Sequence, residues 1–116
     1  MSLVEEILEV DPDIRFVAHL DKDMKLLEMK MRPGVKPLTS EKTDEEFFSI
    51  CHPIIRGVAG KLEDGFGKLK TLRIKYERGS IVFFSIHDEM IAISMNPTPI
   101  TRVVAKIGAR YGIDLE

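Results

Sequence analysis

The residues best suited to chemistry are two alternate carboxylates, three histidines and one cysteine. Asp21 and Asp23 flank Lys22, and alternate carboxylates in a turn could share a hard cation such as Ca²⁺. A calcium loop also needs further oxygen ligands, a glycine at its sixth position and a glutamate at its twelfth, and none follows in register. We therefore interpret Asp21–Asp23 as a solvated hairpin turn.

The histidines are scattered over three predicted elements, at His19, His52 and His87. No two of them have the i, i+2 or i, i+4 spacing that would place two imidazoles on one surface. Cys51 and His52 are adjacent in a predicted helix, so they point to different faces and form neither a two-ligand site nor a nucleophile–base pair. We predict no catalytic, metal or cofactor site, and hence a protein that is not an enzyme.

Cys51 and the glycines near residue 65 have structural interpretations. Cys51 lies on an apolar helical stripe, where a free cysteine is most often a small buried hydrophobe. As the only cysteine, it allows no internal disulfide, which favours a reducing, cytoplasmic location. Gly65-Phe66-Gly67 closes a predicted helix, whereas a phosphate-binding loop follows a strand and opens a helix. We interpret these glycines as helix termination.

The composition is typical of one globular domain, which we expect to span residues 1–116. Hydrophobic residues make up 44% and charged residues 31% of the chain, so a single core is expected. The 17 basic and 19 acidic residues are interleaved, which argues against a nucleic-acid partner. No apolar run approaches the roughly 20 residues that span a bilayer, and the acidic N-terminus does not resemble a signal peptide.

Hydrophobic periodicity predicts the elements of the first half. Residues 3–10 form a short amphipathic helix that Asp11-Pro12 stops. Residues 14–20 and 25–31 form a β-hairpin with one apolar face. We expect that face to carry Ile14, Phe16, Ala18, Leu20, Leu27, Met29 and Met31.

In the second half, the pattern predicts a long helix, three strands and a closing helix. The long helix should begin at about Asp44, with Thr43 as N-cap and Glu46 at N3, and run to residue 62. Strands follow at 71–77, 81–86 and 90–95, joined by turns short enough for an antiparallel meander. The last helix should have Thr98 as N-cap, Pro99 at its first position and Gly112 after its end.

This order, α-β-β-α-β-β-β-α, predicts an α+β fold with a five-stranded antiparallel sheet and helices on both faces. In strand 81–86, Ile81 and Phe83 face one way while Val82, Phe84 and Ile86 face the other. A strand that is apolar on both faces needs a helix layer on each side.

The element order, with the hairpin IRFVAHLDKDMKLLEMKM turning on Asp-x-Asp, resembles the roadblock/LC7 family of the profilin-like and longin-like folds. In that family a glycine usually follows the second aspartate. Met24 stands in its place here, which predicts a different turn. The chain also looks similar to small uncharacterised archaeal proteins.

The resemblance implies a sheet order of 2-1-5-4-3, with the first and third helices on one face and the central helix on the other. It also implies a homodimer in which strands 72–77 pair edge to edge and the central helices meet. The interface residues would then be Phe47, Phe48, Ile50, Ile54, Ile55, Val58, Leu72, Ile74 and Tyr76.

Two function hypotheses follow. The first is a non-enzymatic, homodimeric interaction module that acts as a scaffold or as a regulator of a small GTPase or signalling complex. The alternative is a small-molecule sensor like PAS or GAF domains, which also wrap helices around a five-stranded antiparallel sheet. The sensor hypothesis predicts an internal cavity lined by Met29, Met31, Phe83 and Met95.

Overall fold

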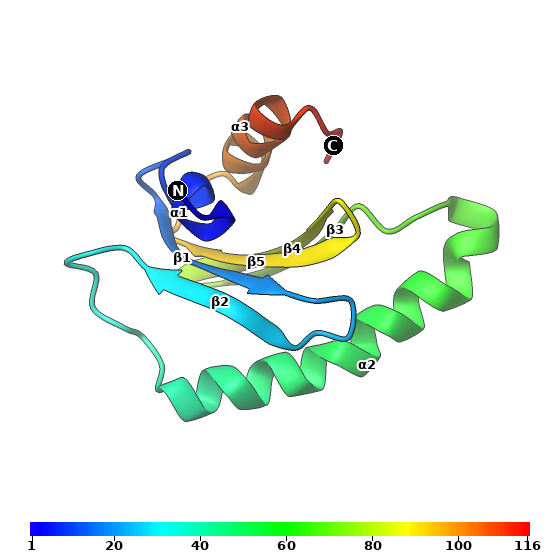
Figure 1. Cartoon of the computed structure of the whole chain (residues 1–116), viewed down its shortest axis with the longest axis horizontal. Coiled ribbons are helices and arrows are strands. Elements are labelled where there is room, and N and C mark those ends of the chain that lie inside the picture. Colours follow the sequence, from blue (N-terminus) through cyan, green and yellow to red (C-terminus); the bar gives the residue numbers. More distant parts are fainter.

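The computed structural model describes all residues 1–116, and its elements follow the predicted order (Figure 1). Three helices and five strands alternate along the chain as the periodicity indicated. Their bounds are α1 (Leu3–Leu8), β1 (Ile14–Leu20), β2 (Leu26–Met31), α2 (Glu41–Phe66), β3 (Thr71–Tyr76), β4 (Gly79–Ile86), β5 (Glu89–Met95) and α3 (Ile100–Tyr111).

The five strands form one antiparallel sheet in the order β2-β1-β5-β4-β3. Figure 1 shows α1 and α3 on one face of this sheet and α2 on the other. Both features confirm what the resemblance implied. Because β2 and β3 are the outer strands, each leaves one row of backbone groups without a partner strand.

The face under α1 and α3 carries the larger core, with 15 buried residues. Val82, Phe84 and Ile86 of β4 belong to it, while Phe83 is buried on the α2 face and Ile81 packs beside it. The predicted division of β4 between two helix layers is therefore confirmed.

A buried carboxylate ties the loop before β1 to α3. Asp11 is fully buried, and its two oxygens accept hydrogen bonds from Arg102 at 3.3 Å and Lys106 at 2.8 Å. The backbone N–H of Asp13 donates a third, at 2.8 Å. Burial alone would raise the pKa of Asp11, but these hydrogen bonds and the two positive charges outweigh it and hold the pKa below its usual value.

The α2 face has a smaller core of seven buried residues. The Phe48 ring stands edge-on to Phe16 of β1 and Phe83 of β4, with ring centroids 6.5 and 6.3 Å apart. The Phe47 ring lies 6.0 Å from Phe83. Such aromatic contacts add stability beyond the area they bury, so these two phenylalanines anchor the first half of α2.

The predicted bounds of α2 were wrong at both ends. Ser40 is the N-cap, because its hydroxyl accepts the backbone N–H of Thr43 at 3.1 Å, and the helix begins at Glu41. At the other end Gly65 stays helical, and Gly67, with φ of +82°, ends the helix. In α3 the N-cap is Pro99 rather than Thr98, and Gly112 ends the helix in the left-handed conformation, as predicted.

The hairpin also departs from simple alternation. A bulge between Ile14 and Phe16 places Ile14 in the α1/α3 core instead of on the α2 side. The expected apolar face of β2 is largely uncovered, since Leu27 is 55% and Met29 39% exposed. Phe48 of α2 contacts Phe16 of β1, while β2 beyond it stays mostly exposed.

The turn at residues 21–25 is held by the side chain of Asp21. Asp21 Oδ1 accepts the backbone N–H groups of Asp23 at 2.8 Å and Lys25 at 2.9 Å. Met24 has φ of +63°, the left-handed conformation that glycine favours. The prediction that this turn differs from the family's usual turn stays a prediction, and Asp21 serves to shape the turn seen here. The third strand ends at Tyr76, one residue before the predicted Glu77.

Candidate protein-interaction surface

One flank of α2 carries apolar side chains that face solvent. Ile50 is 62%, Ile54 51% and Val58 42% exposed. They follow Phe47 at i+3, i+7 and i+11, which places all four on one stripe of the helix. These side chains are not needed to pack α2 on its own sheet.

The direction of this flank follows from the two phenylalanines. Phe47 packs on Phe83 of β4, whereas Phe48 contacts Phe83 and also reaches across to Phe16 of β1. The stripe that continues from Phe47 therefore looks toward the β4–β3 side of the sheet. It lies on the side of α2 where the sheet ends in the free edge of β3.

Strand β3 is an outer strand with a mixed surface. It pairs with β4 from Thr71↔Phe84 to Tyr76↔Gly79 and has no strand on its other side. Leu72 and Ile74 are half-buried against the α2-side core, and Tyr76 is exposed. We call the residues on the α2 flank and on this edge the α2/β3 surface. It comprises Phe47, Ile50, Ile54, Val58, Leu72, Ile74 and Tyr76.

Two residues expected at the interface lie in the core instead. Phe48 and Ile55 are buried against the chain's own sheet, in one cluster with residues of β1, β4 and β5. The sequence pattern could not separate them from Ile50 and Ile54, since a wide apolar stripe does not reveal which part of it meets the sheet.

The last turns of α2 carry apolar residues that sequence reasoning left unused. Figure 1 shows this end of the helix extending beyond the sheet. Leu62 is 54% exposed and Phe66 is 86% exposed. The sequence pattern could have indicated this extension, because Val58, Leu62 and Phe66 lie on one helical stripe at i, i+4 and i+8.

The residues with chemical potential do not come together. Cys51 is buried in the α2-side core, and burial raises the pKa of its thiol, so it lacks the thiolate character of a nucleophile. No group of three or more His, Cys, Asp or Glu side chains is placed to hold a metal ion. His19 contacts Glu89, while His52 has a buried Nε2 without a hydrogen-bond partner.

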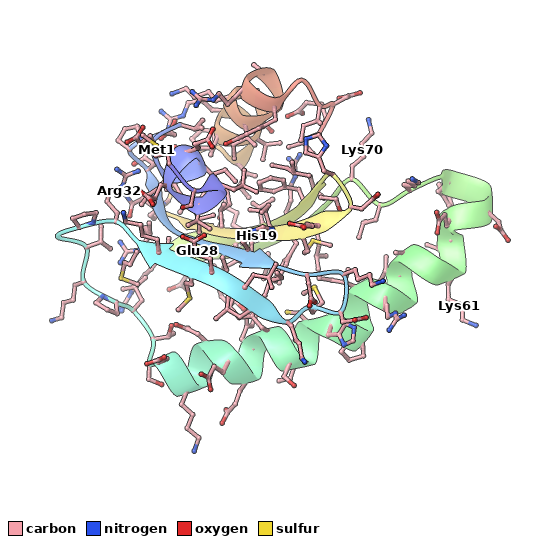
Figure 2. The ribbon with its side chains drawn as sticks, in the orientation of Figure 1. Met1, His19, Glu28, Arg32, Lys61 and Lys70 are labelled. Atoms are coloured by element: carbon pink, nitrogen blue, oxygen red, sulfur yellow. The ribbon has the colours of Figure 1, made fainter.

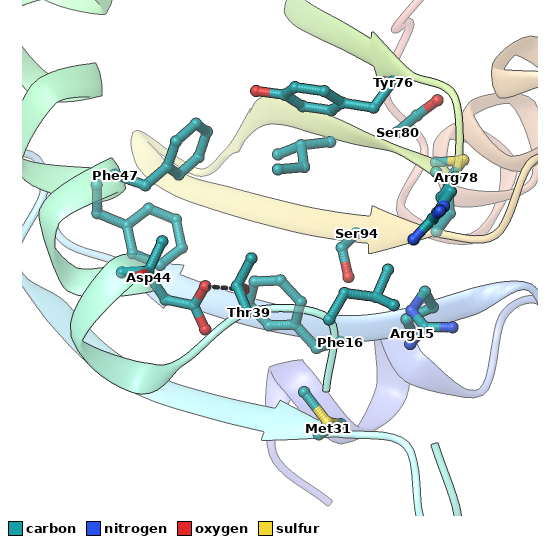
Figure 3. Close-up of a pocket in the computed structure, with 16 residues that line it drawn as sticks. Arg15, Phe16, Met31, Thr39, Asp44, Phe47, Tyr76, Arg78, Ser80 and Ser94 are labelled. Atoms are coloured by element: carbon teal, nitrogen blue, oxygen red, sulfur yellow. Dashed lines mark hydrogen bonds between the residues drawn. The ribbon is translucent and has the colours of Figure 1, made fainter. Parts of the chain in front are cut away.

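A groove of about 430 Å³ lies between the first turns of α2 and the end of the sheet (Figure 3). Its apolar lining comes from β1, β2, β4 and α2, with Phe16, Met31, Ile81 and Phe47. Arg15 and Arg78 also line it. Figure 2 shows side chains between the sheet and the helices on its two faces.

The four residues expected to line a sensor cavity do not share one. Met31 and Met95 border the groove, but Met29 is on the open face of β2 and Phe83 is buried in the α2-side core. Met95 itself is buried with the α1/α3 core, because successive positions of a strand alternate between the two faces. The predicted cavity is therefore wrong in its lining.

Solved structures share this architecture. The gliding protein MglB of Thermus thermophilus superposes with a TM-score of 0.69 at 15% identity, over 93% of this chain and 78% of that one. A roadblock/LC7 domain from Streptomyces avermitilis gives 0.68 at 6% identity, over 95% and 89%. This chain has the roadblock/LC7 fold. Myxococcus xanthus MglB gives 0.70 at 11% identity, over 92% of this chain and 84% of that one.

No protein-family model matches the sequence, and no curated protein matches it. At these identities the likeness lies in the roadblock/LC7 fold alone. The resemblance to small archaeal proteins stays a prediction. No helix in the structure is both long and apolar enough to cross a membrane.

Proposed function

We propose that this chain is a single, non-enzymatic interaction domain that forms a homodimer through the α2/β3 surface. The observation that carries the proposal is the apolar flank of α2 beside a free sheet edge. A contiguous exposed apolar patch on a small protein usually marks an interaction site. Edge pairing of β3 with its copy would satisfy its open backbone groups, and the two α2 flanks would cover one another.

The charges along α2 favour an antiparallel arrangement of the two helices. Glu46 lies about two turns before Ile54, and Lys61 lies about two turns after it. In an antiparallel pair centred on Ile54, Glu46 of one copy would approach Lys61 of the other. Opposite charges at the rim of an apolar contact fix register and orientation.

Gly57 lies between these charges and leaves room for a close approach. A Cβ built at Gly57 would meet no atom within 4 Å, so the chain itself gives no steric reason for a glycine. A glycine on a helix surface lets a second helix pack at a shorter distance. This position supports a helix–helix contact at the centre of the α2 flank.

Solved structures of the same fold support self-association. One structure of MglB has a tetrameric arrangement, and MglB of Thermus thermophilus is a gliding protein. By analogy with the fold, we propose that the homodimer acts in the cytoplasm as a scaffold or as a regulator of a small GTPase or signalling complex. The proposed role rests on the shared fold and not on any particular residue of this chain.

The test replaces Ile54 with Asp and measures the mass in solution by sedimentation equilibrium at micromolar concentration. We expect a dimer for the wild type and a monomer for Ile54→Asp, because a buried, unpaired carboxylate in an apolar interface is costly. Far-UV circular dichroism should stay unchanged, since Ile54 is 51% exposed in the single chain.

The matched control is Leu26→Asp on the opposite sheet edge. Leu26 is 46% exposed, so the two substitutions add the same charge at apolar positions of similar exposure. The control should remain a dimer. A wild-type protein that stays monomeric at 100 µM, or an Ile54→Asp variant that still dimerises, would overturn the proposal.

A further inference from the structure

We infer that the groove under the first turns of α2 binds a small carboxylate with an apolar body, such as a medium-chain fatty acid or an aryl-alkanoic acid. The site shares Phe47 and Tyr76 with the α2/β3 surface but differs from it in kind, because it takes a small molecule and uses two arginines. Its volume of about 430 Å³ falls in the range of ligand pockets.

The lining divides into an apolar body and a cationic end. Phe16, Met31, Ile81 and Phe47 supply apolar walls from three strands and one helix. In Figure 3 the side chains of Arg15 and Arg78 are drawn at the same end of the groove. This polarity matches a molecule with one negative head and an apolar tail.

Neither arginine forms an ion pair with a carboxylate of the chain. Arg15 is half-buried, and it donates to Asn96 Oδ1 at 3.0 Å and to the Lys36 carbonyl oxygen at 2.6 Å. A guanidinium has five N–H donors, so three of its donors remain for a ligand. Two uncompensated guanidinium groups beside an apolar groove favour an anion.

The bulge in β1 explains why Arg15 is available at the groove. Ile14 and Val17 both belong to the α1/α3 core, so the bulge leaves Arg15 and Phe16 together between them. Phe16 packs on the α2 side, and Arg15 lines the same groove. Bulges commonly re-aim a side chain in this way next to functional sites.

The one carboxylate in the lining is engaged elsewhere. Asp44 accepts a hydrogen bond from the Thr39 hydroxyl at 2.5 Å, and Figure 3 shows it on the opposite side of the groove from the two arginines. It therefore does not neutralise the cationic end. It also disfavours a ligand with negative charges at both ends, which selects a monocarboxylate over a dicarboxylate.

The experiment titrates decanoate, decan-1-ol and decylammonium, each below its aggregation limit, into the ¹⁵N-labelled full chain. Decanoate should shift the amides of the groove, including Ile81 and Ser94, and bind at least about tenfold more tightly than the alcohol or the amine. 4-Phenylbutyrate, run in parallel, tells an aryl from an alkyl body, and tight binding of either carboxylate supports the site.

The decisive variants are Arg78→Gln and its control Arg56→Gln, which removes an exposed guanidinium from α2 outside the groove lining. Arg78→Gln should weaken decanoate binding roughly tenfold, and Arg56→Gln should leave it unchanged. Arg78 has no ion pair to lose, so the variant should fold normally.

Equal binding of decanoate and decan-1-ol would overturn the site, as would equal losses in the two variants or shifts confined to the outer flank of α2. If decanoate bound only to the monomeric Ile54→Asp variant, a second copy would fill the groove in the wild type. That result would also overturn the site. Sedimentation of the same samples reports the oligomeric state separately, so failure of this site and failure of the proposed dimer are distinguishable.

Discussion

The two faces of the sheet differ in how much apolar surface their helices bury. We call the face under α1 and α3 the complete face and the face under α2 the incomplete face. Under α1 and α3, 15 residues are buried and a fully buried carboxylate joins the loop before β1 to α3. Under α2, seven residues are buried, a groove remains open and several apolar side chains face solvent. The first face supplies most of the buried core, while the second leaves apolar side chains exposed to solvent.

Adjacent residues of β4 give the largest test of this difference. Phe84 belongs to the complete face and Phe83 to the incomplete one, and each is 1% exposed. We expect Phe84→Ala to lower the free energy of unfolding by about 4 kcal/mol, within the usual range for a rigid core site. Phe83→Ala should cost less, about 3 kcal/mol at the low end of that range, because α2 covers the site and can relax into the space.

Urea denaturation followed by circular dichroism measures both variants, with chains kept monomeric by the Ile54→Asp background. Because both substitutions remove the same atoms from neighbouring positions, the comparison needs no other control. Equal losses would show that the α2 face is as rigid as the other one.

Asp11 tests the electrostatic part of the complete face. We expect Asp11→Asn to lower the free energy of unfolding by about 2 kcal/mol at neutral pH, since a buried acceptor of charged hydrogen bonds is weakened. Arg102 and Lys106 are about half exposed and remain hydrated in the variant, which limits the loss.

The same carboxylate predicts a pH dependence. The folded-state pKa of Asp11 lies below its unfolded value, so its stabilising contribution is present above about pH 4 and is lost as the pH falls through the folded pKa. The pKa of Asp13 is lowered as well, first by its hydrogen bond from Arg102. Urea melts between pH 2 and 7 should show a shallower acid decline in Asp11→Asn than in the wild type. Parallel declines would contradict this assignment.

Gly57 tests the incomplete face in the opposite direction. A Cβ there meets open space, so Gly57→Ala should raise the free energy of unfolding of the monomer by up to about 1 kcal/mol through helix propensity. In the wild-type background, a bulky Gly57→Leu should weaken the dimer while leaving the monomer folded. Sedimentation equilibrium separates the two effects, and a dimer of unchanged strength in Gly57→Leu would place the helix contact elsewhere.

The smallest effect is expected on β2. Leu27 is an apolar residue of the sheet, yet it is exposed, so Leu27→Thr should change the free energy of unfolding by less than about 0.5 kcal/mol. Urea denaturation of the monomer is the measurement. A loss above 1 kcal/mol would mean that α2 covers β2 in solution.

Alternation and helical periodicity predicted the elements and both faces of β4, because those signals depend on near neighbours in sequence. The bulge beside Ile14 could not be predicted from the sequence. An extra residue in a strand moves the side chains before it to the opposite face of the sheet, and the composition gives no sign of it. Ser40 and Thr43 are both favoured N-cap residues, so the start of α2 depends on where the preceding loop meets the helix.

The candidate site was only partly predictable. Ile50 and Ile54 were found with Phe48 and Ile55, because all four lie on one broad stripe and only packing separates core from surface. The groove with Arg15 and Arg78 escaped prediction, since it joins residues far apart in the chain at a place where α2 lies away from the end of the sheet. Such spaces follow from tertiary geometry alone.

The second half of α2 has a thermodynamic consequence of its own. Between Arg56 and Phe66 no residue is buried, and three glycines lower the helix propensity, so little stabilises these turns in a lone chain. Their amide protons should exchange with solvent far faster than those of β5, through local openings that cost little. A partner that orders them would show an unusually negative heat-capacity change on binding, because folding and association would then be one event.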